Sequence, residues 1–253
     1  AAVNLVGLLY ERGRQGFQAV HVMGARNAAE AARAAGATRL GQVSALGADP
    51  ESPSKYARTK AEGEAAAREI FPGLVVARPS IVFGPGDGFF ERFATLAQFS
   101  PALPLIGGGE TKFQPVFVGD VGRALARMVA DSDAEGRTYE LGGPGVFSFK
   151  ALMEMMLAET GQRRLLVPVP WPAASLIGKA GDLVAGIVPP PLTADQVESL
   201  KADNVASGRH PGLADLGVAP TTLEAVLPTY LYRYRKGGQY ADQDARELEA
   251  GRA

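Results

Sequence analysis

The sequence predicts a doubly wound α/β fold with a parallel sheet, followed by a smaller and mostly helical lobe. Apolar runs without polar alternation are typical of strands that are buried on both faces of a parallel sheet. Alanine-rich helical patterns stand between these runs, and alternating strands and helices favour right-handed crossovers. After residue 148 the sequence pattern is that of helices separated by prolines. The predicted strands are 1–9, 39–44, 74–83, 115–118 and 138–141.

The predicted helices have recognisable starts and stops. Helix 17–36 ends at Gly36, because glycine readily adopts the left-handed conformation that closes a helix. Helix 56–70 follows Pro53 and Ser54, which are helix-start residues. Two more helices are predicted at 89–99 and 118–130, a turn at 84–88 and a loop at 105–112.

The second part of the chain is predicted to form the smaller lobe. Helices 149–160 and 171–187 precede a third helix, where Thr193 and Gln196 stand at capping-box spacing. Helix 171–187 is almost uncharged, so it either packs on the core or offers a docking face. We expect a nucleotide-binding domain at 1–148, the lobe at 149–240 and a disordered, charged tail at 241–253.

Composition excludes several classes of function. The net charge is −1 with scattered Lys and Arg, which argues against a nucleic-acid surface. The absence of cysteine removes disulfides and thiolate zinc sites, and with His21 and His210 as the sole histidines we expect no metal site. No apolar run reaches the ~18–20 residues that span a bilayer. We expect a cytoplasmic bacterial protein, with peripheral attachment at the inner membrane left open.

Tyr56 and Lys60 are the candidate pair for catalysis or cofactor binding. Four residues apart, they share one face at the start of a helix. A tyrosine has a reference pKa of about 10, and a nearby ammonium and a helix N-terminus both favour its phenolate. The pair is therefore a candidate for proton transfer, and the lysine can also bind a ribose hydroxyl. Taken alone, the same spacing is also typical of a solvated helix face.

Several further motifs follow in order. The chain reads Arg-Pro-x-x-Val-Phe-Gly-Pro from Arg78 to Pro85, then Val-x-Asp-Val from Val118 to Val121. With the Tyr-x-x-x-Lys pair, these motifs resemble the extended and atypical short-chain dehydrogenases, which have a Rossmann fold. The helix motif Val-x-Gly-x-x-Asn of that family falls on Val22, Gly24 and Asn27.

Three longer strings resemble one atypical branch of that family. They are VSALGADPESPSKYARTKAEGEA, LPLIGGGETKFQPVFVGDV and YLYRYRKGGQY. This branch contains the nucleotide-binding accessory subunit of respiratory complex I and its proteobacterial relatives. The resemblance implies a bound nicotinamide dinucleotide, NADP(H) or NAD(H), and complex I subunits as partners.

The resemblance also implies the site residues. Tyr56, Lys60 and Ser44 correspond to the catalytic positions and also contact the cofactor. Asn4 and Gly7 correspond to the segment beside the adenosine, and Pro79 and Ser80 would offer backbone to the nicotinamide amide. Arg78 is expected in a structural hydrogen bond, and Asp120 as a turn residue or helix cap rather than a catalytic acid.

The chain departs from the family pattern at several places. The glycine-rich phosphate fingerprint after a first strand is absent, so we expect the chain to begin at the fourth strand of the fold. Active members carry a hydroxyl residue where this chain has Leu46, an asparagine where it has His21 and another where it has Ile81. These changes fit a cofactor site that is kept while catalysis has drifted.

Two functions follow as hypotheses. The first is an NAD(P)H-binding accessory or assembly-associated subunit of respiratory complex I with little or no catalysis. The second is an active NAD(P)-dependent reductase or epimerase, in which Tyr56 transfers the proton, Lys60 lowers its pKa and Ser44 polarises a carbonyl. The segment 230–236, in which tyrosines alternate with arginines, is either an interface or a solvated helix end.

Overall fold

A four-stranded parallel sheet forms the centre of the computed structural model, which describes residues 1–185 and 190–238. The strand order is β1-β2-β3-β8, and each neighbouring pair is parallel. The strands are β1 (Ala2–Asn4), β2 (Leu40–Val43), β3 (Val75–Pro79) and β8 (Thr138–Leu141). The predicted parallel sheet is therefore confirmed.

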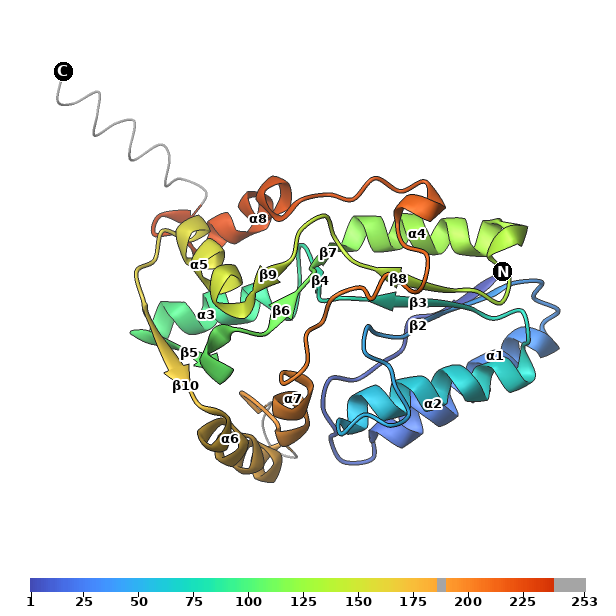
Figure 1. The fold of residues 1–253 in the computed structure, drawn as a ribbon, viewed down its shortest axis with the longest axis horizontal. Helices are drawn as coiled ribbons and strands as arrows, with labels where there is room; N and C mark the ends of the chain where they lie inside the picture. The colour runs from blue at the N-terminus through green and yellow to red at the C-terminus, as the bar shows by residue number, and fades with distance from the viewer. Residues whose placement is uncertain (186–189, 239–253) are drawn as a thin grey trace, which may run out of the picture.

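Helices cover both faces of this sheet (Figure 1). Helices α1 (Gly24–Ala34) and α2 (Lys55–Ile70) lie on one face, and α4 (Val118–Ala130) lies on the other. Alternate strand residues serve the two layers: Leu40, Leu74 and Val76 pack with α1 and α2, whereas Val75 and Ala77 pack with α4. Burial on both faces explains why these strands read as continuous apolar runs.

The predicted helix 17–36 is one helix with an irregular first part. Gln18–Met23 is π-helical, and the N–H of Gly24 donates to the carbonyl of Ala19, five residues earlier. Regular α1 follows to Ala34. The buried residues recur every fourth position at Phe17, His21, Ala25 and Ala29.

The predicted strand 74–83 is wrong as a single strand. β3 ends at Pro79, and the short β4 (Val82–Phe83) pairs with β7 (Val116–Phe117) in a different sheet. The chain leaves the central sheet at Ser80, whose N–H still donates to the carbonyl of Leu141.

The predicted loop 105–112 is partly wrong. β5 (Ala102–Ile106) pairs in parallel with β10 (Leu165–Val169), a strand that the periodicity did not predict. The glycines at 107–109 all have positive φ and form a tight turn after β5. β6 (Lys112–Phe113) then pairs antiparallel with β9 (Phe147–Ser148).

A second hydrophobic core lies beside the sheet. It joins α3 (Phe90–Phe99), α5 (Phe149–Glu159) and α8 (Leu223–Leu231). The segments 83–113 and 149–231 share this core, which therefore spans the predicted boundary at residue 148. The division into a domain and a lobe stays a prediction, and the tail 241–253 lies outside the described residues.

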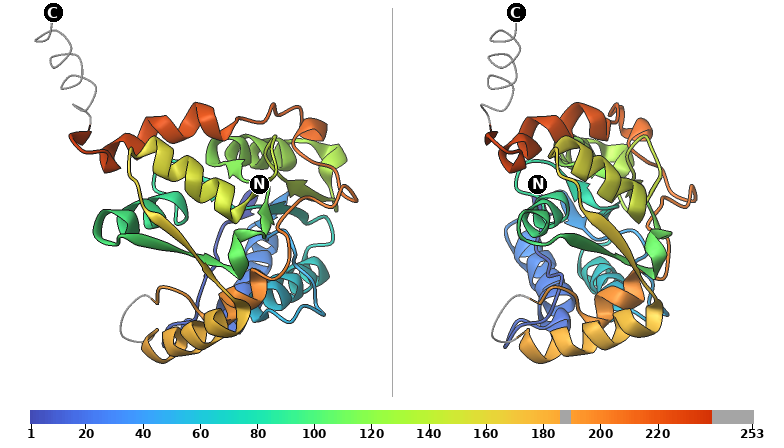
Figure 2. Two further views of the ribbon diagram at one scale, coloured as in Figure 1. Left: turned by 60° about the vertical axis from the view of Figure 1, so that its left-hand side comes forward. Right: turned by 90° about the vertical axis from the view of Figure 1, so that its left-hand side faces the viewer.

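Helices α6 (Trp171–Val184) and α7 (Ala194–Ser199) stand together at one end of the molecule. They lie opposite α8 in both views of Figure 2. The predicted end of α6 at Ile187 lies outside the described residues. Short 3₁₀ turns occur at Ser132–Ala134, Ala214–Leu216 and Tyr232–Tyr234. Within 1–185 and 190–238, no helix has the length and apolar character to cross a bilayer.

Candidate nucleotide site

The first two turns of α2 carry Tyr56 and Lys60, and Lys60 reaches the carboxyl end of β2. Ser54 caps the helix, and its Oγ accepts a hydrogen bond from the N–H of Ala57 at 3.3 Å. An N-cap serine satisfies an amide that the helix itself leaves without a partner. The predicted start at Tyr56 is thus one residue late, and Tyr56 lies in the first turn.

Lys60 is buried and points at the end of the neighbouring strand. Its Nζ donates to the carbonyl of Val43, the last residue of β2, at 2.9 Å. A Cβ placed on Gly7 would lie 3.5 Å from the same Nζ, so the loop after β1 passes directly over the ammonium. Burial lowers the pKa of Lys60 to about 8, although the nearby Glu64 carboxylate opposes the shift. The geometry places one cation between the ends of β1 and β2.

The Tyr56 ring packs among aromatic side chains from the preceding helix. Its centroid lies 5.4 Å from that of His21 and 5.9 Å from that of Phe17, edge-on to both. Burial raises the pKa of Tyr56 to about 12. The expected lowering of this pKa by Lys60 is wrong for the structure, because burial of the phenol alone sets the direction of the shift.

His21 fixes the loop that covers this site. The backbone N–H of Leu8 donates to His21 Nε2 at 3.0 Å, and His21 Nδ1 lies 3.0 Å from Thr59 Oγ1. An acceptor role for Nε2 assigns the proton to Nδ1, which then donates to Thr59. Burial, with help from the Lys60 charge, lowers the pKa of His21 to about 4. His21 is therefore a neutral residue that joins the loop after β1 to α2.

Ser44 is a buried hydroxyl at the end of β2. Its backbone N–H donates to the carbonyl of Ala77, but its Oγ has no hydrogen-bond partner among the described residues. The Oε1 of Gln42, two residues earlier, is likewise buried without one. Since buried polar atoms are rarely left unpaired, these two atoms mark a place that a polar ligand fits.

The remaining predicted residues follow the same edge of the sheet. Asn4 ends β1, and its Oδ1 accepts from the N–H of Val6 at 3.1 Å. At the end of β3, the carbonyl of Pro79 accepts from the N–H of Leu46 at 2.9 Å. The Oγ of the following Ser80 contacts Asn204 Oδ1 at 2.6 Å. Pro79 and Ser80 are thus already engaged within the protein, and their contact with nicotinamide stays a prediction.

Two charged motif residues are structural. Arg78 makes a two-pronged ion pair with the buried Glu64, through Nε at 2.9 Å and Nη2 at 2.8 Å. Asp120 is fully buried, pairs with Arg123 and accepts from the N–H and Oγ1 of Thr221. It therefore ties α4 to the segment before α8.

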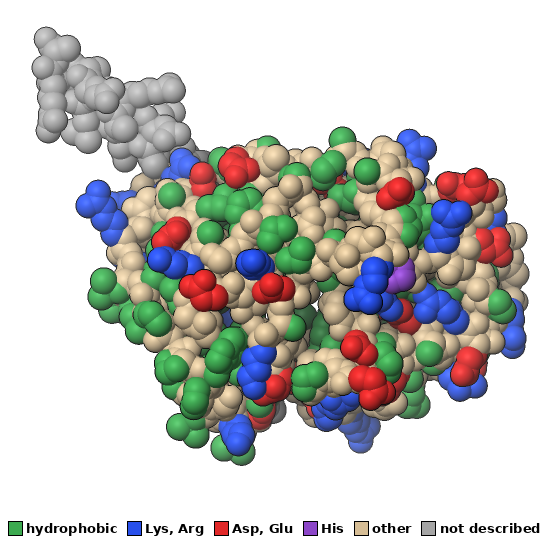
Figure 3. Space-filling view, viewed as in Figure 1, with side chains coloured by type: hydrophobic (Ala, Val, Ile, Leu, Met, Phe, Trp, Pro, Cys, Tyr) green, Lys and Arg blue, Asp and Glu red, His purple; other side chains and the backbone are tan. Residues whose placement is uncertain are grey.

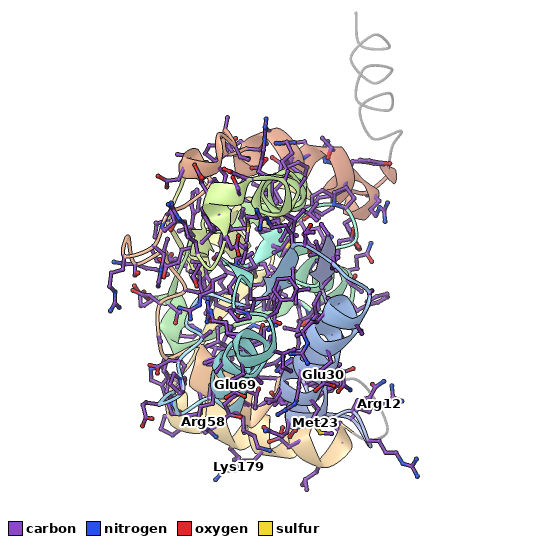
Figure 4. The ribbon with its side chains drawn as sticks, turned by 90° about the vertical axis from the view of Figure 1, so that its right-hand side faces the viewer. Arg12, Met23, Glu30, Arg58, Glu69 and Lys179 are labelled. Carbon is purple, nitrogen blue, oxygen red and sulfur yellow. The ribbon has the colours of Figure 1, made fainter. Side chains whose placement is uncertain are left out.

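An open groove of about 700 Å³ lies between the start of α2 and the end of the molecule that α6 and α7 form. Its walls carry charges of both signs, among them Lys55, Arg58, Lys179 and Asp195. Figure 4 shows Arg58 on α2 and Lys179 on α6 at this end. In Figure 3, charged side chains of both signs border the lower edge of the molecule.

Sequence reasoning missed Glu64 and Asp195. Glu64 continues the Tyr56–Lys60 face by one more turn, so its spacing was a usable signal. Asp195 meets α2 through tertiary packing across 139 residues from Tyr56, and no local pattern marks it.

The parallel sheet, helices on both faces and a Tyr–Lys pair at the carboxyl edge define a Rossmann-type protein, the class that binds dinucleotides at this edge. The chain belongs to the NAD dependent epimerase/dehydratase family, whose model matches residues 8–142. This confirms the resemblance drawn from the motifs.

Individual relatives are similar over most of the chain. A mitochondrial "NADH dehydrogenase [ubiquinone] 1 alpha subcomplex subunit 9" of Arabidopsis thaliana is 36% identical over 244 residues, which are 93% of this chain and 61% of the relative. The chain thus spans less than two thirds of that protein's length. A ceramide reductase of Caulobacter vibrioides is 44% identical over 104 residues, 41% of this chain and 32% of that protein.

A solved structure supports the fold. MoeE5, in complex with UDP-glucose and NAD, superposes with a TM-score of 0.64 at 18% identity. The match covers 90% of this chain and 77% of MoeE5.

Proposed function

We propose that this chain is the NAD(P)H-binding part of an accessory or assembly-associated subunit of respiratory complex I, with little or no catalysis of its own. The similarity to the complex I subunit over 93% of the chain supports the association. The replaced positions Leu46, His21 and Ile81 support the proposal of weak catalysis. The packing of the Tyr56 ring edge-on against Phe17 and His21 agrees with it.

The residues at the sheet edge fit a nicotinamide dinucleotide. Lys60 has one donor engaged with Val43 and, as an ammonium, two more to offer a ribose. Ser44 Oγ is buried without a partner, and the exposed Gly7 lets the backbone approach closely. When bound, the nicotinamide would supply a hydride donor or acceptor. None of these residues selects between NAD and NADP, a choice that Rossmann folds make at a residue about 20 positions after the glycine-rich turn.

Nucleotide retention in the natural full-length protein tests the first half of the proposal. We expect about one NADPH or NADH per chain after purification, detected by extraction and chromatography. Lys60→Met should lose it, because the cation between the strand ends disappears. Lys179→Met is the matched control, since Lys179 is exposed in the groove with no ion pair among the described residues. A wild-type protein without nucleotide would contradict the proposal.

Association with complex I tests the second half. A tagged full-length protein should co-migrate with complex I or an assembly intermediate on native gels of its host's membranes. Migration only as a free protein would contradict the association.

The alternative is an active NAD(P)-dependent reductase, favoured by the 44% identity to the ceramide reductase over 104 residues. A protonated Tyr56 could donate its proton to a carbonyl oxygen as hydride arrives at the carbon. Tyr56→Phe separates the two functions. If wild type reduces a carbonyl substrate and the variant keeps its nucleotide but loses turnover, the reductase is correct.

A further inference from the structure

The carboxylate of Asp195 lies at the N-terminus of α2, although it belongs to α7. Its Oδ1 accepts from the N–H of Lys55 at 2.5 Å, and its Oδ2 accepts from the N–H of Tyr56 at 3.0 Å. Ser54 Oγ also donates to Oδ2 at 3.0 Å, and Ser199 Oγ contacts Ser54 Oγ at 2.9 Å. One acidic side chain therefore binds the backbone of the very residue that carries the candidate phenol.

This contact completes the helix start electrostatically. The first amides of a helix have no partner within it, and their partial positive charge favours an anion. Ser54 satisfies the N–H of Ala57, and Asp195 satisfies two more amides of the same turn. The orientation of Tyr56 thus depends on a residue outside the sheet and its covering helices.

Asp195 is itself rigidly held. Thr193 and Gln196 form the predicted capping box of α7, with both bonds at 3.1 Å. α6 packs against the segment just before α7 at backbone distance: a Cβ on Gly178 would lie 2.8 Å from Ala194 Cα, and one on Gly181 would lie 1.9 Å from the carbonyl of Leu192. α6 and α7 therefore behave as one packed unit.

We propose that Asp195 is a positioning residue through which the α6–α7 unit holds the first turn of α2 in the geometry that binds the nucleotide. The inference rests on the proposed nucleotide site at Tyr56 and Lys60. Without the carboxylate, two amides lose their acceptor and the turn frays, which moves Tyr56 first and Lys60 less. Nucleotide affinity then depends on α7 being docked.

Asp195→Asn in the natural full-length protein is the test, with two measurements. The first is NADPH affinity by fluorescence titration, and the second is hydrogen exchange of the Lys55 and Tyr56 amides. We expect NADPH to bind roughly five-fold more weakly, which is the typical cost of a lost helix cap expressed as an equilibrium ratio. Asn keeps one acceptor oxygen and presents its –NH2 to the other amide, so we also expect one of these two amides to exchange roughly five-fold faster.

Glu198→Gln is the matched control. It removes the same charge from the same helix and the same groove, but Glu198 contacts Lys201 rather than α2. It should leave both measurements at their wild-type values. Should Asp195→Asn prevent folding, Ser199→Ala loosens the same contact more gently, and the two amides should still exchange faster.

The outcomes separate this proposal from the proposed function. Unchanged amide exchange in Asp195→Asn, or a lower melting temperature with unchanged NADPH affinity, would overturn the positioning role. An equal loss of affinity in Glu198→Gln would overturn it too, since charge alone would explain the effect. If wild type binds no NADPH, the proposed function fails, and amide exchange alone decides whether Asp195 holds α2.

Discussion

The buried ion pair between Glu64 and Arg78 can be tested by removing one of its charges. Glu64→Gln keeps the shape of the side chain but leaves Arg78 with a neutral partner. The Glu64 side chain is 2% exposed and that of Arg78 is 20% exposed, so little water can replace the lost charge. Arg78 cannot relieve the loss by deprotonating, because a guanidinium stays charged in proteins even without a partner.

The expected cost is large for a single substitution. Breaking a buried pair costs about 3–5 kcal/mol, and the residual exposure of Arg78 places this case near 3 kcal/mol. For a chain of this size, such a loss lowers the melting temperature by roughly 6–12 °C. Urea unfolding and calorimetry of the natural full-length protein measure both quantities.

Two controls sharpen the result. Glu69→Gln changes the same residue type on the same helix, where Glu69 is exposed and Figure 4 shows it at the surface. It should change stability by less than about 0.5 kcal/mol. A double variant, Glu64→Met with Arg78→Met, should recover most of the loss. The second partner of Glu64, Arg68, is 34% exposed and keeps its hydrogen bond to Thr138, so it tolerates the loss of the carboxylate. A cost below about 1 kcal/mol for Glu64→Gln would refute the reasoning.

Three further predictions concern packing inside the protein. Burial lowers the pKa of His21 in the folded protein to about 4, from its usual 6.5. The free energy of unfolding should therefore fall as the pH drops from 6.5 to 4, by roughly 3 kcal/mol at most. His21→Gln should remove this pH dependence in urea titrations at several pH values. Gly63→Ala should cost about 2 kcal/mol or more of stability in thermal melts, because the new Cβ would lie 2.1 Å from the His21 carbonyl oxygen. Gly122→Ala in α4 is the contrasting case, since nothing lies within 4 Å of its Cβ. It should stabilise the protein by about 0.5–1 kcal/mol. Tyr230→Phe should cost about 1.5–3 kcal/mol of stability in the same melts. The reason is that the buried Tyr230 hydroxyl donates a hydrogen bond to Asp87 at 2.5 Å. A loss below about 0.5 kcal/mol would show that this contact contributes little.

The sequence predicts the sheet better than the surrounding strands. Buried parallel strands such as β2 and β3 read as apolar runs because both faces are covered. β10 escapes prediction, since it carries a proline and its Leu165 and Val167 are exposed. α8 is missed for a similar reason, because Pro228 interrupts its helical pattern.

The candidate site divides in the same way. The Tyr56–Lys60 pair is visible in the sequence because one helical turn brings it together. The phenol's raised pKa is not visible, because it depends on burial by Phe17 and His21 from another helix. Asp195 is invisible for the same reason, as tertiary packing alone brings it to α2.

The widened helical turn at Gln18–Met23 has a consequence for the alignment of Phe17. In a regular α-helix, residues spaced four apart drift by about 40° per step, so a stripe of three such steps would turn by about 120°. The extra residue in the wide turn takes up part of this drift, and Phe17 stays in line with His21 and Ala25. Deleting one residue there would tighten the turn and rotate Phe17 away from Tyr56. The packing of the Phe17, His21 and Tyr56 rings would then open to water.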